Sequence, residues 1–272
     1  MTNTGTISAA PGFVARSDYR DGTDEARMAR ENTVGYKKPL LTEIYAELNL
    51  STAFSQAKLL ELVGRIAGVA PEVEIASVNT VEVKADEGTV IRKTVPRLRC
   101  WSTDRTRLVQ FSPELVVVNQ VGEYLGWSVF EQHFRQVHES LSSVAAVSIQ
   151  SLSLHTIDRL VVDKSRFSVG RFLSCGGAYI PSYYADTTEA CDISLGRGIL
   201  VDDGFNRQVA VGVRIEDAKV TVQITAAFQN LLSDQAGLFA LLDRLHMESN
   251  KTFEALITDE TRQLMGGESG AT

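Results

Sequence analysis

The stretch that divides the chain is LGWSVFEQHFRQVHESLSSVA, residues 125–145. Apolar side chains recur in it at steps of three or four positions, which is the period of a helix with one apolar stripe. The stripe residues are Trp127, Phe130, Phe134, Val137, Leu141 and Val144. This pattern predicts a long amphipathic helix that packs on a sheet, and it separates two segments that each contain several strands.

The segment before this helix predicts a strand, a helix and then further strands. Residues 40–50 alternate between apolar and polar side chains, which indicates a half-buried strand. Residues 59–66 have helical spacing, and Gly68 and Pro71 end that helix. Further strands are predicted at 73–83, 98–102, 108–111 and 115–118, with a turn at 86–88 and a hairpin tip at 103–105.

After the dividing helix the same order begins again. Residues 147–162 predict a long strand that bends near His155, and residues 234–253 predict a final long helix. The sequence Thr-Asp-Glu at 258–260 is typical of a helix start. Shorter strands are predicted at 169–173, 193–201, 209–215 and 220–228.

These two halves, about residues 37–145 and 146–265, predict the fold class. Strands that follow one another through short turns pair antiparallel, and runs of strands that end in a helix are typical of α+β proteins. We therefore predict one α+β body at 37–265, with a mostly antiparallel sheet and its helices packed on one face. Residues 1–36 are expected to be a flexible tail and 266–272 a disordered C-terminus.

The composition is that of an ordinary soluble protein. The chain has 272 residues, of which 44% are hydrophobic and 22% charged, and its net charge of -7 disfavours general nucleic-acid binding. We expect no secretory signal, no membrane association and a cytoplasmic location, because no apolar run is long enough to span a bilayer. Three cysteines without a CxxC spacing suit a reducing compartment.

The residues that could carry catalysis or bind a metal do not form a recognisable motif. Cys175 precedes two glycines, but none of the four histidines has a signature spacing to it. His133 and His138 point to different sides of a helix, and Asp202-Asp203-Gly204 is typical of a turn. The sequence has no phosphate-binding loop, GxSxG or HExxH motif. We therefore predict no catalytic residue, no metal ligand and no cofactor.

One segment departs from the acidic average of the chain. Residues 91–108 contain six basic side chains and a single acid, Asp104. Because residues two apart on a strand share a face, some of them can form a row beside an indole that holds an anion or docks an acidic partner. The candidate binding residues are Arg97, Arg99, Trp101, Arg105 and Arg107.

Their candidate charge partners are Glu43 and Glu47, which share the polar face of the strand at 40–50. If the arginines pair with these two glutamates on a neighbouring strand, the face is an ordinary solvated surface. If both patches line the same sheet face without neutralising each other, they form a mixed-charge groove that can bind a ligand.

Several segments, in this order, resemble one family. They are Pro39-Leu40-Leu41-Thr42-Glu43-Ile44, Pro96-Arg97-Leu98-Arg99, Ser102-Thr103-Asp104, Leu108-Val109-Gln110, Asn119, Tyr124-Leu125-Gly126-Trp127 with Phe130, Ile157-Asp158-Arg159-Leu160, Leu245-His246, Phe253 and Ile257-Thr258-Asp259-Glu260. Over residues 37–265 the chain resembles a sporadically distributed prokaryotic family of uncharacterised proteins of roughly 250 residues. That family usually has Arg, Tyr and Asn where this chain has His155, Thr156 and Asp158. The resemblance implies no agreed activity, but its scattered distribution implies an accessory or defence-type gene.

These observations predict a non-enzymatic binding protein of such a system, which recognises a protein partner or a small anionic ligand through a sheet face. A first alternative is a metal-dependent enzyme that acts on a nucleotide or polyphosphate in the same groove. A second is a structural homo-oligomer subunit, with residues 115–119 or 209–215 as the edge strand that pairs with another copy.

Overall fold

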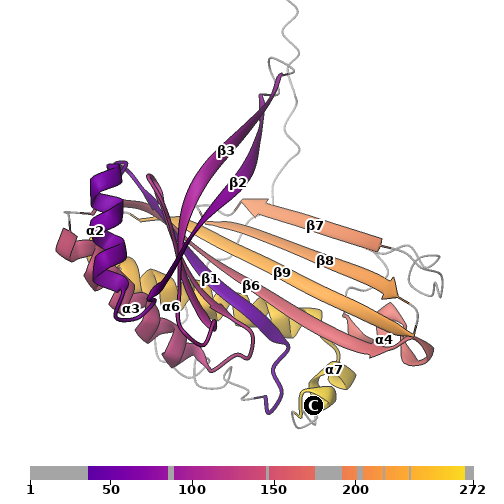
Figure 1. Ribbon diagram of the computed structural model, residues 1–272. Coiled ribbons are helices and arrows are strands. Elements are labelled where there is room, and N and C mark those ends of the chain that lie inside the picture. The colour runs from indigo at the N-terminus through magenta and orange to yellow at the C-terminus, as the bar shows by residue number, and fades with distance from the viewer. Residues whose placement is uncertain are drawn as a thin grey trace, which may run out of the picture. The chain divides into compact units, whose positions relative to one another are not determined.

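The computed structural model describes residues 36–84, 89–144, 147–174, 192–200, 205–216, 218–232 and 234–266, all of which belong to one compact unit, Gly35–Thr272. These residues form an antiparallel nine-stranded sheet in the order β2-β3-β4-β5-β1-β6-β9-β8-β7 (Figure 1). Its strands are β1 (Leu41–Leu50), β2 (Glu72–Lys84), β3 (Thr89–Trp101), β4 (Arg107–Ser112), β5 (Leu115–Val121), β6 (Ile149–Asp163), β7 (Asp192–Leu200), β8 (Asn206–Glu216) and β9 (Lys219–Leu231). The predicted α+β class is confirmed.

The two halves of the chain meet at the centre of the sheet, where β1 pairs antiparallel with β6. Each half begins with its central strand and next places a strand at the outer edge, β2 in the first half and β7 in the second. Each half then adds strands inward until β5 lies beside β1 and β9 lies beside β6. The two halves therefore share one sheet. After its central strand, each half adds its remaining strands from the outer edge toward the centre.

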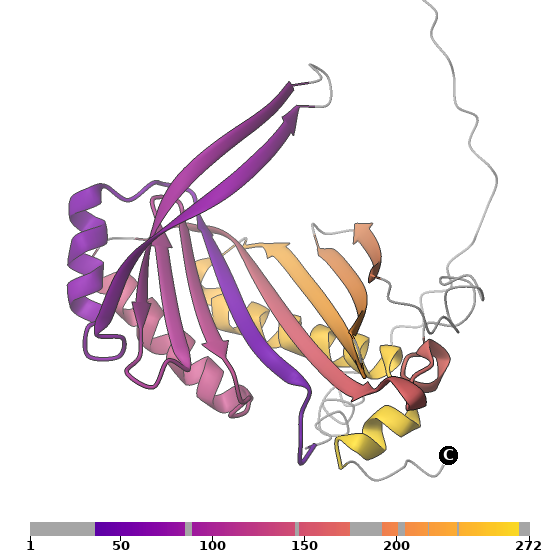
Figure 2. The same cartoon turned by 45° about the vertical axis from the view of Figure 1, so that its right-hand side comes forward.

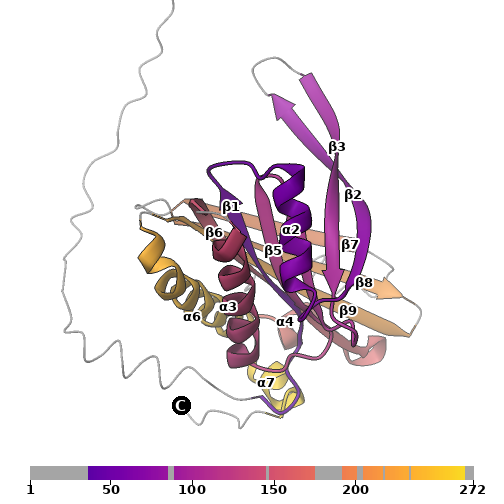
Figure 3. The ribbon, with the colours of Figure 1, turned by 60° about the vertical axis from the view of Figure 1, so that its left-hand side comes forward.

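Three helices cover one face of this sheet (Figure 3). They are α2 (Gln56–Ile66), α3 (Trp127–Val144) and α6 (Leu238–Leu256). The strands present alternate apolar residues to them: Ile44, Ala46 and Leu48 of β1 are at most 1% exposed. Helix α3 begins after Gly126, whose φ of 102° favours glycine, and its stripe is buried as predicted, except that Trp127 and Val144 are only partly buried.

A second, smaller apolar cluster lies at the far ends of β6, β8 and β9. It includes Val169 and Phe172 of the short helix α4 (Val169–Phe172), together with Ile257 and Met265, which flank the short helix α7 (Asp259–Leu264). Thr258 caps α7 as predicted, because its hydroxyl accepts a hydrogen bond from the Thr261 amide at 3.4 Å. The strand predicted at 169–173 is wrong: the segment forms α4, because its buried residues Val169 and Phe172 are three positions apart, which suits one helical turn.

The hairpin of β2 and β3 is longer than predicted and extends beyond the rest of the sheet (Figure 2). The two strands pair without interruption from Glu72 with Trp101 to Lys84 with Thr89. Strand β4 pairs only with residues 98–101 of β3, so the remainder is a two-stranded ribbon. The predicted turn at 86–88 lies outside the described residues.

The strands proposed as edges for self-association are not edges. Residues 115–119 belong to β5, between β4 and β1, and residues 209–215 belong to β8, between β9 and β7. The strands at the ends of the sheet order are β2 and β7. Sequence alternation shows that a strand has a polar and an apolar face, but not which strands lie beside it.

Some predictions concern residues outside the described part of the chain. These are the tail at 1–36 apart from Tyr36, the C-terminal residues 267–272, and the segments containing Cys175, Cys191 and Asp202-Asp203-Gly204. Among the described helices, none is long and apolar enough to cross a membrane.

Candidate ligand-binding site

The sheet face opposite the three helices carries most of the residues predicted from the sequence. The strand registers place Arg99 of β3 in one cross-strand row with Gln110, Val117 and Glu47. They place Trp101 in the next row with Leu108, Asn119 and Tyr45. The residues of β3 and β1 therefore share what we call the helix-free face, with β4 and β5 between them.

Hydrogen-bonded side chains cross this face from β3 to β1. Arg99 Nε donates to Gln110 Oε1 at 3.2 Å, and Gln110 Nε2 donates to Asn119 Oδ1 at 3.2 Å. Asn119 Nδ2 then donates to Glu43 Oε1 at 2.9 Å. Gln110 is 8% exposed and Asn119 3%, so this relay compensates two amides that would otherwise be costly to bury. It links the predicted residues Arg99 and Glu43 through Gln110 and Asn119, which the sequence offered only as part of the family resemblance and not as candidate binding residues.

Two glutamates of β2 neutralise much of the basic segment. Arg105 Nη2 lies 2.7 Å from Glu72 Oε2, and Arg99 Nη1 lies 3.8 Å from Glu74 Oε1. Trp101 Nε1 also donates to Glu74 Oε1 at 2.8 Å. The acids that pair with these arginines are therefore Glu72 and Glu74 on β2. The alternation in residues 72–75, read with a β2–β3 pairing, was the signal that could have identified them.

Arg107 does not belong to the helix-free face. The turn after β3 pairs Trp101 with Leu108, so odd-numbered residues of β3 lie on the same face as even-numbered residues of β4. The Arg107 position therefore falls on the helix-covered face, where the cation adds to burial in lowering the pKa of His133 to about 4. The prediction for Arg107 failed because an even number of residues separates the paired positions Trp101 and Leu108. Odd-numbered positions of β3 and β4 therefore lie on opposite faces of the sheet.

Tyr45, Glu47 and His155 form a cluster on the helix-free face. The Tyr45 and His155 rings stack with centroids 4.4 Å apart and planes at 6°. His155 Nε2 lies 3.6 Å from Glu47 Oε2, which is too long for a hydrogen bond. Tyr45 and His155 occupy paired positions of β1 and β6, so the strand register brings them together.

Arg97 acts on this cluster from the other side of β4 and β5. Burial works to raise the pKa of Glu47, but His155 and Arg97 outweigh it, so the pKa lies below its usual value. Burial and the charges of Glu47 and Glu43 raise the pKa of Tyr45 to about 12, although Arg97 opposes this rise. Arg97 is therefore close enough to favour the ionised forms of both Glu47 and Tyr45.

Two polar nitrogens on this face lack hydrogen-bond partners. Arg97 Nε and His155 Nε2 are both buried, and neither makes a hydrogen bond within the described part of the chain. A buried donor without an acceptor costs about 1–3 kcal/mol. A bound ligand can supply the hydrogen-bond partner that such a group lacks.

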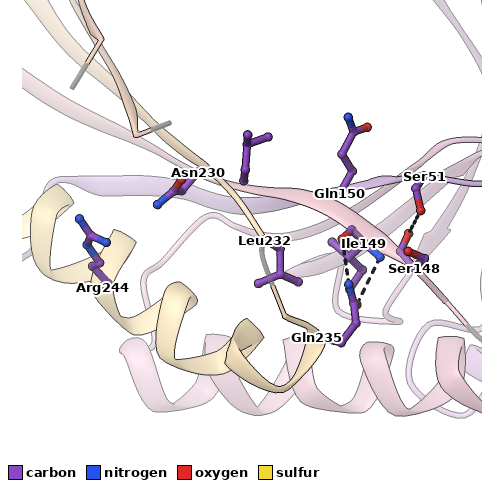
Figure 4. Close-up of a pocket in the computed structure, with 9 residues that line it drawn as sticks. Ser51, Ser148, Ile149, Gln150, Asn230, Leu232, Gln235 and Arg244 are labelled. Atoms are coloured by element: carbon purple, nitrogen blue, oxygen red, sulfur yellow. Dashed lines mark hydrogen bonds between the residues drawn. The ribbon is translucent and has the colours of Figure 1, made fainter. Parts of the chain in front are cut away.

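A separate cleft of about 930 Å³ lies at one end of the sheet beside α6 (Figure 4). Its polar residues mostly hold strand ends: Ser51 Oγ donates to the Ser148 carbonyl at 2.9 Å, and Gln235 bonds both the amide and the carbonyl of Ile149. The buried Asn230 Oδ1 has no hydrogen-bond partner in the described residues. None of the seven candidate binding residues and charge partners predicted from the sequence lines this cleft.

The described residues hold no group of three His, Cys, Asp or Glu side chains that could bind a metal ion. Cys100 is buried, and burial raises the pKa of its thiol to about 11, which makes the reactive thiolate scarce. His246 stacks on Trp127 at 3.8 Å and contacts Asn250, and burial lowers its pKa to about 4. These side chains have packing roles.

No model of a known protein family matches the chain, and no curated protein matches it. The resemblance to the sporadically distributed prokaryotic family therefore stays a prediction.

Proposed function

We propose that the protein is a non-enzymatic binding protein that takes a small anionic ligand on the helix-free face, between Arg97 and the Tyr45–His155 pair. The observation that carries this proposal is the pair of buried nitrogens, Arg97 Nε and His155 Nε2, that lack hydrogen-bond partners. A carboxylate or phosphate oxygen is the acceptor that a guanidinium group prefers.

The surroundings favour a small ligand over a broad protein surface. The relay residues Gln110 and Asn119 and the neighbouring Ser153 are at most 8% exposed, so the middle of this face offers little surface to a large partner. Glu47 lies beside the unpaired nitrogens and is ionised well below neutral pH. The ligand should therefore carry a hydrogen-bond donor for Glu47 as well as an anionic group for Arg97.

The biological setting is part of the same proposal. The resemblance to the sporadically distributed family supports a role in an accessory or defence-type prokaryotic system, with the protein in the cytoplasm. Small anionic metabolites are abundant in the cytoplasm, and they differ in the hydrogen-bond donors that they carry beside the anionic group.

The test is a titration followed through the backbone amide signals in nuclear magnetic resonance. The probes are inorganic phosphate, L-glutamate and adenosine monophosphate. We expect saturable shifts at Tyr45, Glu47 and His155 with at least one probe, and Arg97→Ala should weaken that binding roughly 10–100-fold, the worth of a hydrogen bond to a charged group.

Arg107→Ala is the matched control, because it removes an arginine of the same segment whose position lies on the opposite face. It should change the affinity less than about twofold. Equal losses in both variants, or shifts confined to the cleft around Asn230, would contradict the proposed site.

A further inference from the structure

The two edges of the sheet are built differently. β7 has 9 residues and contains Gly196 and Gly198, which weaken a strand. β2 has 13 residues, contains neither glycine nor proline, and pairs with β3 in one unbroken register. No described strand pairs with its outer edge. Long, regular edge strands are the ones that can pair with another chain, and the protection that β2 does carry is its charged side chains.

The base of β2 also exposes apolar side chains. Ile75 is 78% exposed, more than any other large hydrophobic residue in the described part of the chain, and Val73 is 50% exposed. The two residues lie on the same face of the strand, since they are two positions apart. A monomer leaves both in water.

The sequence of β2 is close to a palindrome. EVEIASVNTVEVK, residues 72–84, reads in nearly the same order of residue types from either end, with Val78 at its centre. Antiparallel pairing of two copies about Val78 sets position 73 opposite position 83, which are both valine. It sets Ile75 opposite Val81. Such self-complementarity is what a two-fold interface between identical chains requires.

The charged pairs of this register balance one another. Antiparallel pairing about Val78 sets Glu72 opposite Lys84 and Glu74 opposite Glu82, and each pair occurs twice, once on each side of the axis. Glu72 already pairs with Arg105 at 2.7 Å. Glu74 already accepts a hydrogen bond from the Trp101 indole and lies 4.0 Å from Arg105, so part of its charge is compensated before the two copies meet.

We propose that two copies of the chain associate through their β2 strands, paired antiparallel about a two-fold axis at Val78. The partner is a second copy because the edge is complementary to itself. The sheets of the two copies become continuous across the axis. Ile75 and Val73 then lie in apolar cross-strand pairs.

Disulfide trapping tests the register directly. In a background with Cys175→Ser and Cys191→Ser, Val78→Cys should cross-link to its own copy under mild oxidation, since paired positions have Cα atoms about 4.5–5.5 Å apart. Ala76→Cys is the matched control. Its copy would lie four residues away along the ladder, about 13 Å, which is beyond the reach of a disulfide.

The mass in solution tests the association itself. Light scattering should give twice the 29.8 kDa chain mass for the parent protein, and Ile75→Lys should give the monomer mass with an unchanged circular dichroism spectrum. Leu264→Lys, on α7, changes another exposed hydrophobic residue and should leave the dimer intact. A monomeric parent protein at about 200 µM, where a dimer with a micromolar Kd is mostly formed, or equal cross-linking of the two cysteine variants, would overturn the proposal.

Discussion

The ten residues of β1 alternate between two faces of the sheet that differ in chemistry. Ile44, Ala46 and Leu48 face the helices and are almost fully buried, whereas Glu43 and Glu47 face the polar network. Apolar burial on the first face stabilises the fold without directional contacts. The second face carries polar groups, each of which needs its own hydrogen-bond partner.

Each face also contains exceptions to its own chemistry. The helix-covered face includes His133 and Asp158, which are 2% and 7% exposed. The helix-free face includes Val117 and Leu108, buried among the relay residues. The following changes test whether stability resides mainly on the helix-covered face, in order of decreasing effect.

The largest effect is expected from Phe134→Ala in α3. Phe134 is fully buried and meets the edge of Phe239 with ring centroids 6.1 Å apart. The cavity should lower the free energy of unfolding by about 3–5 kcal/mol, measured by urea denaturation. A loss below about 1 kcal/mol would show that the helix layer is not the main source of stability.

The second effect concerns Asp158 and pH. Burial raises its pKa from 3.8 to about 7, and the residue lines a small gap with apolar neighbours such as Leu160 and Ile224. The folded protein therefore holds this proton more tightly than the unfolded chain. Stability from this group is complete below pH 4 and is lost as the pH rises to 7, by at most about 1.4 kcal/mol per pH unit.

The Asp158→Asn variant isolates this contribution. His133 and His246 act in the opposite direction, because their lowered pKa values cost stability as the pH falls from 6.5 to about 4. Both histidines are present in the parent protein and in the variant, so the difference between the two stability curves reports Asp158 alone. The difference should change between pH 4 and 7, and parallel curves would show that Asp158 does not titrate there.

The third change is Asn119→Ala, on the helix-free face. It removes the link between Gln110 and Glu43 and should cost about 1–3 kcal/mol, because both partners lose a hydrogen bond in a buried setting. The exposed residue Gln150 provides the control, and Gln150→Ala should cost less than about 0.5 kcal/mol. Equal unfolding midpoints for the two variants would show that the relay adds no stability.

The smallest effect is expected from Arg105→Ala. Its guanidinium pairs with Glu72 and lies 5.3 Å from the Trp101 ring centre, but the side chain is 55% exposed. Exposed pairs of this kind contribute less than about 1 kcal/mol, and salt screens them. Thermal unfolding at low and high salt should show a small difference only at low salt. A large difference that persists in high salt would show that packing on Trp101 matters more than charge.

The sequence predicted those parts of the fold that depend on local periodicity. The stripe of α3, the alternation of β1 and the Thr258 cap repeat within a few residues, so their signals are complete in a short window. The order of the strands, and therefore the sheet edges, depends on pairings between distant segments. The strand prediction at 169–173 failed for another reason, because a few apolar residues in a short run suit a turn of helix as well as a strand.

The candidate site was predictable in part. Residue alternation grouped Arg97, Arg99 and Trp101, and the structure places them on one face with Glu43 and Glu47. Alternation could not carry the grouping through a turn of unknown length, which is why Arg107 was misplaced. Tyr45 and His155 became neighbours only through the β1–β6 register, for which neither segment alone carries a signal.

The position of β1 at the centre of the sheet has a consequence for how the chain folds. β1 is the first of the described strands to be made, yet its partners come much later: Glu43 and Asn119 are 76 residues apart, and β6 follows α3. During synthesis β1 has both backbone edges unpaired until β5 emerges, and one edge remains open until β6 follows. Closing such distant contacts is slow, so β1 is the segment of the nascent chain that most needs protection from aggregation.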